Sequence, residues 1–314
     1  MHYQTKLMLK DAFLNWSSFI FNLLHFVRHS QQEMDLSMLR NLVLSLPVEL
    51  RARYAKECEF IETMSIGDIS AIMLPYSVVT KEGGDGVRAH LENAHPYILH
   101  KEKKLFFPRC LSQGEVVSEY KSLVFREGLL GSGMLAKSPH CYQDENFQVE
   151  SGDILLDVGC AEAIFSLDNI EKVSKAYLFE CGSVWRKPLK LTFAPYKDKV
   201  VLVNKLVSDK TTRKSTTLVD VVKDDMAGNT HFFVKMDIEG WERTVIKGNA
   251  DFFKNAKVKL SCCVYHRQDD AKVIEGMLKE LGYESRFSEG WMLPTMNGIH
   301  YPYFRHGVIY AQNY

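Results

Sequence analysis

Two carboxylates follow an apolar run in the second half of the chain, within residues 234–242 (VKMDIEGWE). The run begins at Phe232 and ends at Asp237 and Glu239, which a glycine follows. Open α/β sheets bind ligands where a strand ends and the chain turns into the next helix. We therefore expect this corner to lie between a cofactor and a substrate. The alternative is that Glu239 only caps a helix that starts at Trp241.

A second stretch with the features of a binding loop is residues 157–163 (DVGCAEA), which end a short apolar segment. Its small residues let a ligand approach the backbone, and the N-terminus of a following helix would add a favourable dipole. Glu180 ends the next apolar segment, 21 positions after Gly159. An acid about 20 residues beyond such a loop is placed to hydrogen-bond a ribose diol. The pattern therefore predicts a cofactor that contains adenosine.

The loop also restricts which cofactor it can hold. A dinucleotide site uses three glycines so that the backbone can reach the pyrophosphate. Here Gly159 is the one glycine, and Glu162 would repel a pyrophosphate. An acidic loop suits a cationic cofactor without phosphate, so S-adenosylmethionine fits and NAD and ATP do not. The alternative is a tight turn that binds no ligand.

His266 follows the next apolar segment and completes a set of three candidate catalytic residues with Asp237 and Glu239. Imidazole titrates near neutrality, so it can accept the proton of an acceptor hydroxyl. The alternative is a histidine that only closes the edge of a strand. We expect the two acids to differ, one serving the cofactor or a metal and the other the acceptor or the helix start. The three side chains could ligate a divalent cation, but no ligand spacing demands one, and we predict none.

Several of these strings together resemble the FkbM-type methyltransferases: residues 155–165 (LLDVGCAEAIF), 177–180 (YLFE), 235–240 (KMDIEG) with Glu242, and 264–267 (VYHR) with Asp270. The resemblance covers roughly residues 138–314, and the Lys-x-Asp-x-Glu-Gly string is its most specific part. The family belongs to the class I S-adenosylmethionine-dependent methyltransferases, which mostly methylate hydroxyl oxygens, often on sugars. One departure is the first loop, which usually reads Gly-Ala-Asn-x-Gly and here reads Gly-Cys-Ala-Glu-Ala.

The resemblance implies an O-methyltransferase that transfers a methyl group from S-adenosylmethionine to a sugar or glycan-type hydroxyl by in-line displacement. The expected catalytic residues remain His266, Asp237 and Glu239. The expected cofactor contacts are Asp157, Gly159, Cys160, Ala161, Glu162, Phe165, Glu180 and Asp237. Residues 138–142 (SPHCY) could fold over this site as a lid, or form a plain linker.

Alternating apolar segments supply the elements that position these residues. Strands are predicted over residues 154–158, 176–179, 200–203, 232–236, 258–265, 283–287 and 308–311. Helices are predicted between them over residues 163–173, 185–193, 217–222, 241–253 and 269–281. Such alternation implies right-handed crossovers and a doubly wound α/β fold with a mostly parallel sheet. The resemblance implies that this is the seven-stranded sheet of a Rossmann-like methyltransferase.

We place the predicted S-adenosylmethionine-binding methyltransferase domain at residues 146–314. An N-terminal helical and β-rich extension precedes it. Residues 1–56 show helical spacing over 5–30 and 35–56, with Pro47 opening a second helical piece, and form a cap or a dimer interface. Residues 57–145 contain an expected β-hairpin over 60–74 and a helix over 115–130. We expect this second region to shape the substrate site or an interface.

Composition restricts the partners and the compartment. The 39 basic and 39 acidic residues among 314 cancel, which argues against nucleic acid as a partner. The apolar segment 12–27 is too short to span a membrane and is interrupted by polar residues, so we predict no membrane span. The seven cysteines contain no C-x-x-C pair, and no secretory signal is evident, which favours the cytoplasm.

Two other functions are alternatives to methyl transfer. The altered first loop favours a non-catalytic scaffold that keeps the methyltransferase-like fold, whereas the retained acids Glu180, Asp237 and Glu239 argue against it. An NAD-linked dehydrogenase is excluded by the glycine count. The expected partner is a small-molecule or glycan acceptor, and a homodimer could form through the N-terminal region.

Overall fold

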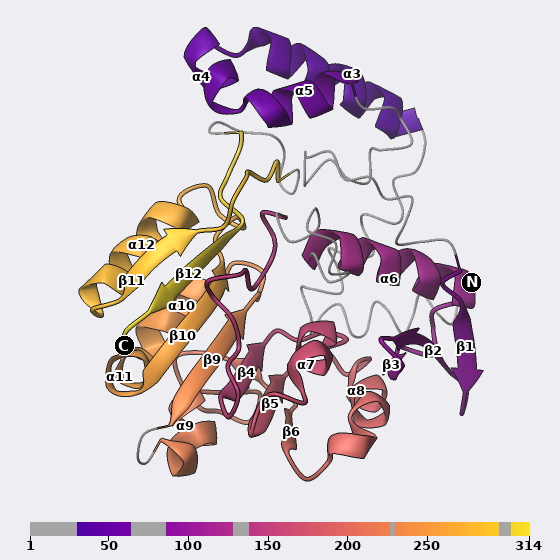
Figure 1. Ribbon diagram of the computed structural model, residues 1–314, viewed down its shortest axis with the longest axis vertical. Coiled ribbons are helices and arrows are strands. Elements are labelled where there is room, and N and C mark those ends of the chain that lie inside the picture. Colours follow the sequence, from indigo (N-terminus) through magenta and orange to yellow (C-terminus); the bar gives the residue numbers. More distant parts are fainter. Residues whose placement is uncertain (1–29, 64–85, 128–137, 227–229, 295–302) are drawn as a thin grey trace.

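A computed structural model describes residues 30–63, 86–127, 138–226, 230–294 and 303–314. Its centre is a seven-stranded sheet with helices on both faces (Figure 1). The strands are β4 (Ile154–Val158), β5 (Lys175–Phe179), β6 (Val200–Val203), β9 (His231–Met236), β10 (Lys257–Cys263), β11 (Glu284–Phe287) and β12 (Val308–Gln312). The predicted doubly wound α/β fold is confirmed.

The strand order is β11-β12-β10-β9-β4-β5-β6. Strands β10, β9, β4, β5 and β6 are mutually parallel, whereas β12 runs antiparallel to both of its neighbours. The order reverses between β4 and β9, so the ends of these two strands form the point at which open α/β sheets bind ligands. The two acidic stretches of the sequence therefore meet at this point.

Both faces of the sheet are buried, which explains the nearly continuous apolar runs of its strands. Neighbouring residues face opposite sides: Leu155 and Phe233 enter one hydrophobic core, and Leu156 and Val234 the other. The first core is completed by α6 (Gln113–Glu127), α7 (Ile164–Asn169) and α8 (Arg186–Thr192). The second is completed by α9 (Leu218–Val222), α10 (Glu242–Gly248), α11 (Ala250–Asn255) and α12 (Asp270–Glu280).

The helix expected over 241–253 is in fact two helices, α10 and α11, which meet at Asn249. The buried Asn249 amide accepts a hydrogen bond from the Leu218 N–H at 2.6 Å and donates to the Ser208 carbonyl at 3.0 Å. Beside it, a Cβ on Gly248 would lie 2.3 Å from the Asp209 Cα. These close contacts fix the break. The expected helix over 163–173 is likewise shorter, since α7 ends at Asn169.

The hairpin expected over residues 60–74 is wrong where the structure describes it. Residues 60–63 belong to the helix α5 (Ala55–Thr63), whose buried Cys58 and Ile61 pack at helical spacing with Leu39 and Val43. The remaining hairpin residues, 64–74, lie outside the described residues. An antiparallel sheet lies further along the chain instead, in β1 (Ala89–Glu92), β2 (His95–His100) and β3 (Lys103–Phe106).

The other N-terminal predictions have mixed outcomes. The helices α3 (Ser30–Ser45) and α4 (Val48–Arg53) confirm helical structure over most of 35–56, and α4 begins directly after Pro47. The helix α6 confirms the prediction over 115–130 as far as Glu127. The segment 12–27 lies outside the described residues. Among the described helices, none is long and apolar enough to cross a membrane.

Candidate functional site

The two acidic stretches are locked together at Gly159. Its φ is +78°, and a Cβ at this position would lie 2.0 Å from the backbone oxygen of Asp237. Only glycine allows the backbone after β4 to pass this close to the end of β9. The same loop contains two non-glycine residues with positive φ, Ala161 at +45° and Ala163 at +62°. The predicted cofactor loop and the predicted catalytic corner therefore form one structural unit.

Lys235 reinforces this junction from within the sheet. Its buried ammonium donates to the Gly159 carbonyl at 2.7 Å and pairs with Asp157 at 3.1 Å. Ser166 donates to the other Asp157 oxygen at 2.6 Å. Burial alone would lower the pKa of Lys235, but nearby acids raise it, and Asp157 contributes most. Asp157, an expected cofactor contact, therefore stabilises the loop through its contacts with Lys235 and Ser166.

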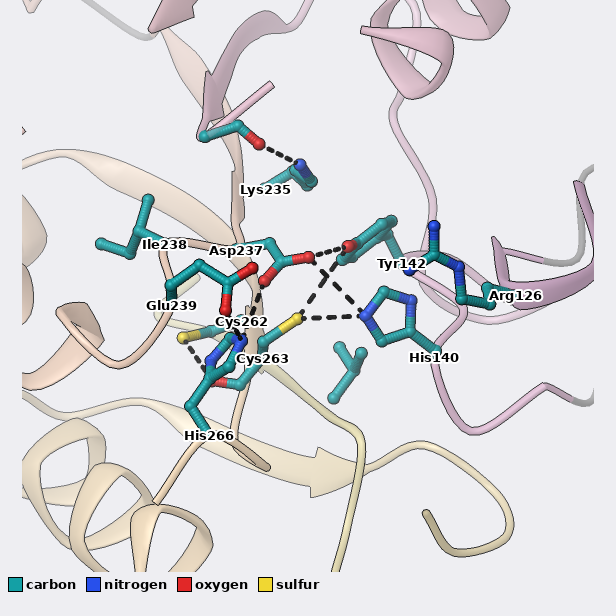
Figure 2. Close-up of polar contacts among 12 residues, drawn as sticks. Arg126, His140, Tyr142, Lys235, Asp237, Ile238, Glu239, Cys262, Cys263 and His266 are labelled. Atoms are coloured by element: carbon teal, nitrogen blue, oxygen red, sulfur yellow. Dashed lines mark hydrogen bonds and ion pairs between the residues drawn. The ribbon is translucent and has the colours of Figure 1, made fainter. Parts of the chain in front are cut away.

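Asp237 lies at the centre of the polar cluster shown in Figure 2. The Tyr142 hydroxyl donates to its Oδ2 at 2.7 Å, and His140 Nε2 lies 3.6 Å from the same oxygen. His266 Nε2 lies 3.4 Å from its Oδ1. Burial alone would raise the pKa of Asp237, but His266, His140 and Lys235 hold it below the ordinary range. Asp237 therefore stays ionised.

His266 is held among three carboxylates. Its side chain is 4% exposed, its Nδ1 lies 3.0 Å from Glu242 Oε1, and its Nε2 lies 3.5 Å from Glu239 Oε2. Burial alone would lower the pKa of His266, but Glu242, Asp237 and Glu239 raise it to about 9. Asp270, its neighbour in the sequence motif, pairs instead with Arg243. The imidazole is therefore charged at neutral pH.

Glu239 is the most exposed acid of the corner, with 31% of its side chain accessible. Its φ is +56°, so the chain has left the strand, which ends at Met236, and turns sharply here. Burial raises the pKa of Glu239 to about 7. The helix α10 has no side-chain cap at its N-cap residue, Trp241, which is itself exposed. The two acids of the motif are therefore electrostatically different.

Among the expected cofactor residues, Glu180 follows β5 and lies beside the loop, whereas Cys160 and Glu162 belong to the loop itself. Glu180 is buried and accepts hydrogen bonds from the backbone N–H groups of Ala161 at 3.1 Å and Gly182 at 2.5 Å. Burial raises the pKa of Glu180, and it raises that of the buried Glu162 to about 7. Cys160 is buried in the first core.

Phe165 lies apart from the polar groups of the loop. Its ring packs edge-on against Tyr142, with a centroid distance of 5.6 Å, and lies at a tilt of 30° beside the Phe233 ring, with a centroid distance of 5.8 Å. It is buried in the first core, so its direct contribution is to packing beneath the loop.

Sequence reasoning missed three contributors to this corner: His140, Tyr142 and Glu242. The first two belong to residues 138–142, which were expected to be a lid or a linker and are in fact buried against Asp237. Glu242 appears in the resembling motif, but its contact with His266 spans a sharp turn that spacing does not reveal.

The strand order and the helices on both faces of the sheet define a Rossmann-like α/β fold. Residues 190–285 match the family model described as the Methyltransferase FkbM domain, which confirms the resemblance to FkbM-type methyltransferases. A search of curated proteins found no match.

Three solved structures are similar to this chain over about half of its length. Methyltransferase FkbM from Methylobacillus flagellatus KT is 20% identical, with a TM-score of 0.41 over 52% of this chain and 44% of that one. The precorrin-6y C5,15-methyltransferase of Geobacter metallireducens is 12% identical, with a TM-score of 0.36 over 54% and 82%. A Streptococcus pneumoniae protein assigned as a tRNA (m1A22) methyltransferase, in complex with S-adenosyl-L-methionine, is 14% identical, with a TM-score of 0.35 over 52% and 67%. The chain thus spans less than half of the Methylobacillus protein.

Proposed function

We propose that this protein is an S-adenosylmethionine-dependent O-methyltransferase that acts on a hydroxyl of a sugar or glycan-type acceptor. The match to the FkbM domain supports the class of activity. The observation that carries the proposal is the packing of Gly159 against the backbone of Asp237. This contact sets a cofactor-type loop and a cluster of acids at the same edge of the sheet, as methyl transfer between two ligands requires.

The cofactor half of the proposal rests on the acids around the loop. Glu180 lies at the end of β5 and would accept hydrogen bonds from the ribose hydroxyls, in place of one of its present backbone donors. Glu162 is a buried carboxylate in the same loop, and a cationic cofactor would favour its ionised form. Both features suit a sulfonium cofactor without phosphate.

The acceptor half of the proposal assigns the proton transfer to Glu239. In an in-line displacement the acceptor oxygen bonds to the methyl carbon, the carbon–sulfur bond breaks, and its electron pair stays on sulfur. The hydroxyl proton needs a base with a pKa near the working pH. Glu239 meets this condition with a pKa of about 7 and partial exposure, whereas the charged His266 does not. His266 then positions Asp237 and Glu239 rather than accepting the proton, which revises the expectation from the sequence.

A calorimetric titration with S-adenosylmethionine tests the cofactor half. The wild-type chain should bind one equivalent, and Glu180→Ala should weaken binding about tenfold by removing a hydrogen-bonding acid. Glu275→Ala, which changes an exposed acid on α12, is the matched control and should bind as the wild type does. Absence of binding to the wild type would contradict the proposal and favour the non-catalytic scaffold.

The N-terminal helices suggest a partner as well. We propose a homodimer through this region, because α3 and α4 expose the apolar side chains of Met38, Leu44 and Val48 at 55%, 59% and 79%. Light scattering of the full chain should give the mass of a dimer, and Met38→Glu with Leu44→Glu should give that of a monomer. A monomeric wild type would rule this interface out. The cytoplasmic location and the three domain boundaries stay predictions.

A further inference from the structure

Three residues of the acid corner have buried polar atoms that form no hydrogen bond, namely Asp237 (Oδ1), Glu242 (Oε2) and His266 (both ring nitrogens), and the one ion pair between these atoms, Asp237 Oδ1 to His266 Nε2, spans 3.4 Å. The same three residues each offer one potential ligand atom, and these atoms lie within 4.8 Å of one another. Nearly all buried polar atoms in proteins form hydrogen bonds, so atoms without one on three neighbouring side chains indicate a missing partner. We propose that Asp237, Glu242 and His266 form a binding site for a divalent cation.

The distances at the imidazole support this assignment. His266 Nε2 lies 3.4 Å from Asp237 Oδ1 and 3.5 Å from Glu239 Oε2. Figure 2 shows the side chains of His266, Asp237 and Glu239 pointing toward one another. Ligand atoms that share an ion with bonds of about 2.1 Å lie about 3.0 to 3.4 Å apart. Small movements of these side chains would therefore complete a coordination shell, with Glu239 on its exposed side.

The charge of the corner points in the same direction. Asp237, Glu239 and Glu242 offer three carboxylates, and His266 is the cation among them. The nearby Lys235 is already paired with Asp157. A divalent cation at this place would compensate the negative charge of the carboxylates. Carboxylates with one imidazole suit Mn²⁺, Fe²⁺ or Zn²⁺ better than ions that prefer sulfur ligands.

Two other groups of potential ligands exist among the described residues, and each is less suitable. In the group of His140, Asp237 and Cys263, the Asp237 oxygen that lies nearest His140, Oδ2, already accepts a hydrogen bond from Tyr142 at 2.7 Å. Glu150, Asp153 and His231 form the other group, in which the ammonium of Lys259 already pairs with Glu150. The second group provides a control.

The site is part of the corner assigned to the acceptor, so its catalytic use rests on the proposed function, but its occupancy does not. A bound cation would lower the pKa of an acceptor hydroxyl that coordinates it. Ion binding can therefore be measured without cofactor or acceptor.

The experiment uses the full chain, stripped with a chelator and titrated with Mn²⁺, while electron paramagnetic resonance follows the signal of the free ion. We expect the wild type to bind at least one equivalent. His266→Ala and Asp237→Asn should each lose one equivalent, and His231→Ala should retain the wild-type stoichiometry. Circular dichroism establishes that each variant is folded.

Three results would overturn the inference: no binding by the wild type, full binding by a folded Asp237→Asn, or loss of the ion in His231→Ala alone. Failure of Mn²⁺ binding together with normal S-adenosylmethionine binding would reject the metal site and leave the proposed function standing. The reverse result would reject the proposed cofactor and leave the metal site standing.

Discussion

Replacing His266 by glutamine tests the charged state of the acid corner directly. The folded-state pKa of His266 is about 9, whereas an unperturbed histidine titrates near 6.5. The native state therefore binds this proton more tightly than the unfolded state does. Its contribution to stability is fully present below about pH 6.5 and is lost as the pH rises through about 9.

The size of the effect follows from the difference between the two pKa values. A difference of about 2.5 units corresponds to about 3 kcal/mol, at roughly 1.4 kcal/mol per unit. The His266 side chain is 4% exposed, so solvent screens this contribution little. The stability gap between the wild type and His266→Gln should therefore shrink by up to about 3 kcal/mol between about pH 6.5 and 9.5.

Urea unfolding at several pH values, with a chelator present to keep the protein free of metal, measures this gap. A substitution on the exposed surface, Glu275→Gln, should leave the pH dependence of the wild type in place. An independent readout is the imidazole C2–H resonance that disappears in His266→Gln, which should titrate near pH 9. Parallel stability curves for the wild type and His266→Gln, or a midpoint near 6.5, would refute the assignment of His266 as a buried imidazolium.

Three further predictions concern the same corner. The initial rate of methyl transfer at saturating cofactor should rise with pH around a midpoint near 7, because Glu239 must lose its proton. The Glu239→Gln variant should lower kcat by about 10²–10⁴-fold. An unchanged rate in this variant would show that another group accepts the proton. Gly159→Ala should destabilise the fold by about 3 kcal/mol in urea unfolding, because its Cβ would lie 2.0 Å from the Asp237 oxygen, and a neutral effect would mean that the loop can move away. Tyr142→Phe should cost about 1.5 to 3 kcal/mol by removing the 2.7 Å hydrogen bond to the Asp237 carboxylate, and a smaller loss would indicate that water replaces the hydroxyl.

The sheet could be predicted from the sequence because its strands are buried on both faces. Leu155 and Leu156 face opposite cores, so the strand is a continuous apolar run that stands out between polar turns. The positions of Gly159 and Glu180 at strand ends follow from the same pattern. The hairpin prediction failed because the segment 60–63 is too short to show its period, and the helical spacing is visible only when the packing of Ile61 is known.

The composition of the site was less predictable, because its contacts join distant parts of the chain. Tyr142 is 95 positions from Asp237, and no spacing rule connects them. His266 was expected to be a neutral base from its ordinary titration range. Three carboxylates from the turn between β9 and α10 reverse that expectation, and their approach depends on backbone angles that residue types alone do not specify.

The turn after β9 determines how one short motif lies beside both proposed ligand sites. Positive φ angles at Glu239 and Gly240 reverse the chain, so that Glu239 lies beside His266 and stays partly exposed while Glu242, at the start of α10, is fully buried. Glu242 then accepts a hydrogen bond from the Ile238 N–H at 3.0 Å and pairs with His266 through the same oxygen. This bond ties the turn to the imidazole, so the ring that orients Glu239 is itself held by the backbone beside it. Lys235, at the other end of the motif, faces the cofactor loop. The motif therefore couples the positions of the two ligand sites through one rigid turn, and a change at Glu242 should disturb the acceptor corner before it disturbs the Gly159 loop.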